Sequence, residues 1–74
     1  MAGSRLTAII EREGPLFIAR CMEFDIASQG SSAATAMENL KRAVASFAEH
    51  TENAEIQERL ARDVKVRRFE IRPS

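Results

Sequence analysis

Apolar residues follow two different periods along this chain. Up to Gly30 the apolar runs are short, contain β-branched residues and are separated by turn-forming residues. This pattern predicts strands over Leu6–Arg12 and Leu16–Met22, joined by a reversal at Glu13-Gly14-Pro15. The short run Ile26–Gly30 predicts a third strand, so residues 5–30 are expected to form a small antiparallel meander.

From Ser31 the apolar residues take the period of a helix. Their spacings of 3, 4 and 3 run through Met37, Leu40, Val44 and Phe47. We predict a main helix over 31–51, capped by Ser31 or Ser32, whose apolar stripe lies on the sheet. A short second helix over 53–62 is predicted around Ile56 and Leu60, with the i,i+4 pairs Glu55–Arg59 and Glu58–Arg62 on its surface.

Residues 64–72 return to the period of a strand. The apolar positions change parity between Val66 and Phe69, and a bulge near Arg67 and Arg68 reconciles the two halves. The predicted order is β-β-β-α-(α)-β, a two-layer α+β domain. Residues 1–4 are expected to be a disordered N-terminus or a tag remnant.

Length and cysteine content limit how such a chain is stabilised. Seventy-four residues make a single small domain, and Cys21 is the only cysteine, which excludes an internal disulfide and a zinc-type ligand set. Self-association is therefore expected, as a homodimer or a larger homo-oligomer. The charged content of 30% leaves no run for a membrane span, and without a signal-peptide pattern we expect a cytoplasmic protein.

Charge is distributed unevenly, although the net charge is zero. Residues 1–58 carry nine acidic and five basic side chains, a net charge of −4, and residues 59–74 carry two acidic and six basic ones, a net charge of +4. An acidic body suits a basic protein partner through electrostatic steering. The basic residues Lys65, Arg67 and Arg68 suit an edge strand protected from aggregation, a subunit contact, or a nucleic-acid contact.

The chain is poor in groups for catalysis. The only histidine, His50, falls in the last turn of the main helix, where it suits a capping role, and Cys21 suits a small buried hydrophobe. Glu11, Glu23 and Asp25 offer a carboxylate cluster for Mg²⁺, which would make the chain a vestigial nuclease, but surface carboxylates explain them as well. We expect no enzymatic activity, no metal and no cofactor.

Three stretches together carry a family resemblance: Leu6-Thr7-Ala8-Ile9-Ile10-Glu11-Arg12-Glu13-Gly14, Ala19 to Gly30, and Ala36-Met37-Glu38-Asn39-Leu40-Lys41. In these stretches the chain resembles the HicB family of type II toxin-antitoxin antitoxins. The resemblance spans roughly Arg5 to Phe47, and its most specific part is Ser28-Gln29-Gly30 followed by a helix with Glu38-Asn39-Leu40. The chain departs from many relatives at Met22, where they carry proline, and at Ala34 and Thr35, where they carry an acidic residue.

The resemblance implies a partial RNase H-like fold without catalytic carboxylates, and an antitoxin that binds and masks a HicA-type mRNA interferase. The better-studied HicB antitoxins also carry a C-terminal DNA-binding module. That module has no counterpart in this sequence, so we expect no DNA-binding domain. The expected toxin contacts, chosen for charge and position, are Glu11, Glu13, Glu23, an exposed Phe24 and Asp25. Two alternatives stay open: a nucleic-acid-binding module that uses the basic C-terminal segment, and an oligomeric HicB-like protein with no toxin partner.

Overall fold

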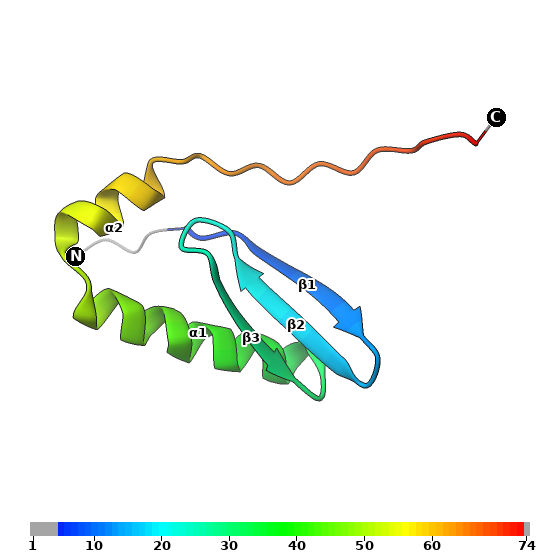
Figure 1. Ribbon diagram of the computed structural model, residues 1–74, viewed down its shortest axis with the longest axis horizontal. Helices are drawn as coiled ribbons and strands as arrows, with labels where there is room; N and C mark the ends of the chain where they lie inside the picture. Colours follow the sequence, from blue (N-terminus) through cyan, green and yellow to red (C-terminus); the bar gives the residue numbers. More distant parts are fainter. Residues whose placement is uncertain (1–4, 74) are drawn as a thin grey trace.

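A three-stranded antiparallel sheet in the order β1-β2-β3 forms the first layer of the protein. The computed structural model describes residues 5–73, so the prediction for residues 1–4 lies outside the described part. The strands are β1 (Ala8–Glu13), β2 (Leu16–Cys21) and β3 (Ile26–Gly30) (Figure 1). The predicted meander is confirmed, and both of its outer strands, β1 and β3, are sheet edges.

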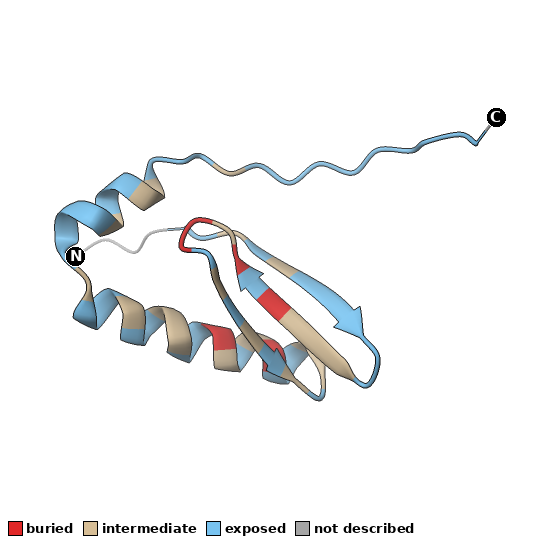
Figure 2. Ribbon diagram, in the orientation of Figure 1, coloured by how far each residue is buried: buried red, intermediate tan, exposed pale blue. Residues whose placement is uncertain are grey.

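Helix α1 (Ala33–His50) forms the second layer and lies alongside β3 and β2 (Figure 1). Alternation along β2 turns Phe17, Ala19 and Cys21 toward this helix, and Ala19 and Cys21 are buried against Ala36 and Leu40. The buried residues lie on β2, on α1 and in the loop between β2 and β3, whereas β1 is mostly exposed (Figure 2). The helix therefore covers one side of the sheet and leaves β1 largely uncovered.

Local sequence signals explain where the elements begin and end. Gly14 takes a φ of 62° in the two-residue turn between β1 and β2, a conformation that suits glycine. Ser32 is the N-cap of α1, and its hydroxyl accepts a hydrogen bond from the Thr35 amide at 3.1 Å, as one of the two predicted caps requires. Asn39 then ties the helix to the sheet by donating to the Gln29 carbonyl at 2.8 Å.

The second helix, α2 (Asn53–Leu60), follows α1 after a short bend. Its apolar residues Ile56 and Leu60 pack against the core, and the predicted Glu55–Arg59 pair forms at 3.2 Å. The chain is thus a small α+β structure with a meander followed by two helices. None of the helices in residues 5–73 is both long and apolar enough to cross a membrane.

The structure differs from the sequence prediction after α2. Residues 64–72 form no strand and no bulge; they run as an extended segment that leads away from the sheet (Figure 1). The physical reason is that a strand needs a neighbouring strand to accept and donate its ladder hydrogen bonds. No backbone hydrogen bond between this segment and another element is present among residues 5–73.

The close approach of β3 to α1 yields a prediction about stability. A Cβ atom added at Gly30 would lie 2.5 Å from the Ala36 nitrogen and 2.9 Å from the Thr35 carbonyl carbon, both parts of the helix backbone. We expect Gly30→Ala to lower the free energy of unfolding by about 1–3 kcal/mol, because the helix must shift to relieve the overlap. Chemical denaturation measures the change.

The matched control for this substitution is Gln29→Ala, because Gln29 is exposed and its hydrogen bond with α1 is made by its backbone carbonyl, which the substitution keeps. We expect a change within about 0.5 kcal/mol for the control. Equal stability of Gly30→Ala and the wild-type chain would contradict the packing described here.

Candidate protein-binding surface

The loop between β2 and β3 holds three of the predicted contact residues, and Glu23 is built into the structure there. The Glu23 side chain is 5% exposed and accepts hydrogen bonds from the Thr7 amide at 2.8 Å and the Thr7 hydroxyl at 2.7 Å. The Cys21 thiol lies 3.9 Å from the same carboxylate. Glu23 therefore ties this loop to the chain just before β1 and is not available as a surface contact.

Electrostatics at Glu23 favour its charged form. Burial raises the pKa of the Glu23 carboxyl, but hydrogen bonds from Thr7 and from its own amide, together with the charge of Arg62, lower the pKa more. The net result is a pKa below the ordinary value of 4.5. The ionised carboxylate is thus part of the folded state.

Phe24 is a core residue, so the prediction that it is exposed is wrong. It is 5% exposed, and its ring lies 5.0 Å from the ring of Phe47 on α1. The guanidinium of Arg59 lies 5.3 Å from the other ring, that of Phe47, in a cation–π contact. The sequence predicted an exposed Phe24 because its neighbours in the chain are polar, and the pattern does not show that Phe47 of α1 packs against it.

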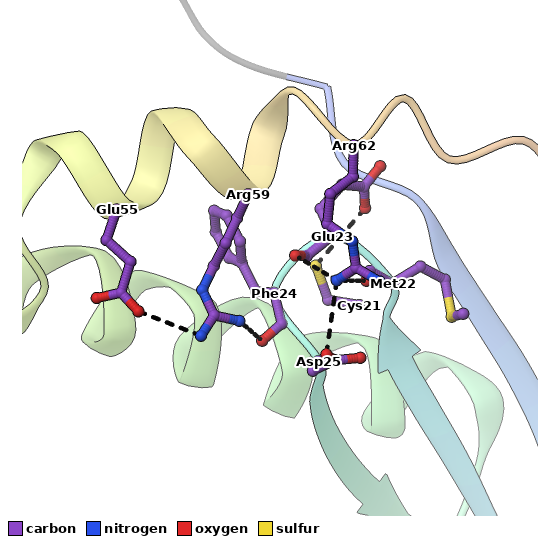
Figure 3. A network of polar contacts seen from close by, with 8 residues as sticks. All are labelled: Cys21, Met22, Glu23, Phe24, Asp25, Glu55, Arg59 and Arg62. Carbon is purple, nitrogen blue, oxygen red and sulfur yellow. Dashed lines mark hydrogen bonds and ion pairs between the residues drawn. The ribbon is translucent and has the colours of Figure 1, made fainter.

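Arg59 in α2 and Arg62 just after it donate hydrogen bonds to the loop between β2 and β3 (Figure 3). Arg59 donates to the Phe24 carbonyl at 3.0 Å, and Arg62 donates to the carbonyls of Met22 and Glu23, both at 3.1 Å. Arg62 also lies 3.5 Å from the carboxylate of Asp25. It makes these contacts in place of the predicted i,i+4 pair with Glu58.

The loop itself requires these donors. Asp25 has a φ of 56°, a left-handed conformation that aspartate tolerates in turns, and the loop carbonyls before it have no strand beside them. The sequence pattern did not indicate that Thr7, Arg59 and Arg62 are partners of this loop. The only signal for the arginines was their charge, since 35 or more residues separate them from the carbonyls that they contact.

The other predicted acidic contacts, Glu11 and Glu13, are exposed on β1. The register places Glu11 opposite Ile18, on the sheet face turned away from α1, and Glu11 pairs with Arg20 at 3.7 Å. Among residues 5–73 no helix packs on that face, where Ile9 and Ile18 are half-buried. The structure thus keeps Glu11 and Glu13 on an accessible face and separates them from buried Glu23 and Phe24.

An apolar groove lies on the opposite face, between β1 and α1. It has a volume of about 330 Å³ and is lined mainly by apolar side chains, among them Leu6, Cys21, Met37, Leu40 and Val44. The sequence pattern assigned Met37 and Val44 to a stripe covered by the sheet. They line a groove because α1 packs on β2 and β3 and scarcely reaches β1.

Groups with catalytic or metal-binding chemistry do not converge in residues 5–73. No group of three or more His, Cys, Asp or Glu side chains is placed to hold a metal ion there. His50 makes a hydrogen bond with the Ser46 carbonyl at 2.8 Å, as a residue at a helix end does, and Cys21 is buried. The described residues instead provide three surface features that a partner could bind: an acidic sheet face, an apolar groove and a basic extended segment.

Comparison with known proteins adds no relative: no family model, no curated protein and no solved structure matches this chain.

The buried Glu23 carboxylate generates a prediction about pH. We expect Glu23→Gln to lower the free energy of unfolding by about 1–3 kcal/mol at pH 7, since the amide cannot accept both hydrogen bonds from Thr7. Because the folded-state pKa lies below 4.5, the stabilisation by the carboxylate is present above that pH and is lost as pH falls through the folded-state value. Urea denaturation at several pH values measures both effects.

The control is Glu13→Gln, which alters an exposed carboxylate on β1 and should leave stability nearly unchanged. The difference between the wild-type chain and Glu23→Gln should shrink in acid. A difference that stays constant from pH 7 to pH 3 would contradict a role for the ionised carboxylate.

Proposed function

We propose that this chain is a non-catalytic, HicB-like antitoxin that binds and masks a HicA-type mRNA interferase. The observation that carries the proposal is the sheet face turned away from α1, where exposed Glu11 and Glu13 stand beside half-buried Ile9 and Ile18. A patch with an apolar centre and charged surroundings is the usual anatomy of a protein interface. The resemblance over Arg5–Phe47 supplies the class of partner.

Charge supports a basic partner for this face. Residues 1–58 carry a net charge of −4, and Glu11 and Glu13 stand on an edge strand that a second protein reaches without obstruction. HicA-type interferases are small basic proteins, so complementary potentials would speed their encounter with the acidic face. The burial of Glu23 and Phe24 narrows the proposed contact set to Glu11, Glu13 and, at the far end of the sheet, Asp25.

The proposal includes the partial RNase H-like fold of that family and a cytoplasmic protein. Support for the non-catalytic part comes from the use that the structure makes of the carboxylates. Glu23, which a nuclease centre would share with Glu11 and Asp25, is engaged by Thr7, and Arg62 lies beside Asp25. A Mg²⁺ ion would have to displace these contacts before it bound.

The proposal requires a HicA-type interferase encoded beside the gene for this chain, and the test uses that interferase with the purified chain; the absence of such a gene would contradict the proposal. We expect the wild-type chain to form a complex with the interferase and to inhibit its cleavage of RNA. The double variant Glu11→Lys/Glu13→Lys should weaken binding about tenfold or more, mainly through slower association, because it reverses the charge of the acidic face. Calorimetry gives the affinity, and stopped-flow mixing gives the association rate.

The matched control is Glu49→Lys/Glu52→Lys, which makes the same change in net charge near the end of α1, away from β1. The control should bind almost as tightly as the wild-type chain. The proposal fails if the wild-type chain does not inhibit the interferase, or if both double variants lose affinity equally.

A further inference from the structure

The extended segment after α2 has the composition of a strand and no strand beside it. Most of the segment is exposed (Figure 2). Its large apolar side chains Val66, Phe69 and Ile71 are exposed to 51%, 85% and 81%, which is unusual for side chains of this kind. The segment makes no backbone ladder with other parts of residues 5–73. An unpaired apolar strand of this kind is a template for pairing with another chain.

The same protein has a site that could pair with such a strand. β1 is an edge strand, and beside it lies the apolar groove of about 330 Å³ lined by Leu6, Met37 and Val44. The register places Ile10 on the α1 side of the sheet, opposite buried Ala19, yet Ile10 is 40% exposed because no strand within residues 5–73 pairs with the outer edge of β1. One added strand would pair with β1 and lay the apolar side chains of one of its two sides over Ile10 and the groove.

The geometry of the chain keeps its own segment away from this site. Arg62 is held by the carbonyls of Met22 and Glu23, so the point at which the segment starts is fixed against the β2–β3 loop. Asp63 follows with a φ of 51°, and from there the backbone leads away from β1 (Figure 1). Within one chain, both the extended segment and the groove therefore remain uncovered.

We propose that two copies of this chain form a dimer in which each inserts residues 64–72 along the β1 edge of the other. In that position Phe69 and Ile71, which share one side of an extended segment, face the groove beside Ile10. Reciprocal exchange closes the assembly with a twofold axis, because each copy donates one segment and receives one. This inference goes beyond the proposed binding of a toxin and does not depend on it.

The length and the charge of residues 64–72 both fit a position along β1 of a second copy. Residues 64–71 extend over about 26 Å and the six residues of β1 over about 20 Å at about 3.3 Å per residue, so the segment spans the strand. The exchanged segment, residues 64–72, carries four basic side chains and one acidic one, a net charge of +3, and residues 1–63, which are not exchanged, carry a net charge of −3. The exchange brings unlike charges together across the interface, whereas any contact between two bodies or two segments brings like charges together.

Sedimentation of the full chain tests the dimer. We expect a mass about twice the 8.3 kDa of one chain at micromolar concentration. Phe69→Asp/Ile71→Asp should weaken dimerisation by about 30-fold or more, since it places two charges in the groove. The matched control Glu70→Gln/Arg72→Gln changes two neighbouring residues without changing net charge, and it should sediment as the wild-type chain does.

Cross-linking separates exchange from folding back. In a Cys21→Ala background, a chain with Ile10→Cys is mixed with a chain with Ile71→Cys and treated with a short thiol-reactive cross-linker. Exchange predicts a covalent pair that contains both chains, and the Phe69→Asp substitution should abolish it. A chain with both Ile10→Cys and Ile71→Cys that cross-links only within itself would overturn the proposal, as would a dimer unaffected by Phe69→Asp/Ile71→Asp.

Binding of nucleic acid is the competing explanation for the exposed segment. A wild-type chain that sediments as a monomer and binds a single-stranded oligonucleotide at low salt through Lys65, Arg67 and Arg68 would also overturn the proposal.

Discussion

The hydrogen bonding of one four-residue loop, Met22 to Asp25, holds the parts of this protein together. Its carbonyls lie outside the sheet ladder and must find donors elsewhere, because a buried carbonyl without a partner is costly. Arg59 and Arg62 supply those donors from the far end of the chain, while Thr7 satisfies the carboxylate of Glu23 from the near end. The loop therefore fixes the position of α2, the start of β1 and the burial of Phe24 together.

This arrangement divides the acidic residues of the body into two groups with different roles. Glu23 stabilises the fold, because its charge is matched within the molecule. Glu11 and Glu13 stand on an edge strand with little to restrain them and are available to a partner. The same division applies to the arginines, since Arg59 and Arg62 are used by the loop and those of residues 64–72 are not. The protein thus keeps both an acidic face and a basic segment exposed.

The sequence predicted those features that depend on local periodicity, namely the meander, both helices, the turn at Gly14 and the cap at Ser32. It could not predict the loop, because Glu55–Arg59 and Glu58–Arg62 have the same spacing and only the first forms. Arg62 instead binds the carbonyls of Met22 and Glu23, which are distant from it in the sequence. The pattern of residues 64–72 predicted a strand that the structure does not contain, because a strand also requires a neighbouring strand and periodicity says nothing about neighbours.

The extended segment also bears on how long the protein survives. Proteases bind their substrates as extended peptides, and Lys65, Arg67 and Arg68 offer several cleavage points within an exposed stretch. Cleavage there would leave the sheet, both helices and the Arg62 contacts intact while removing the exposed segment that follows them. If a second copy covers the segment as proposed, proteases would trim a lone copy faster than an assembled one.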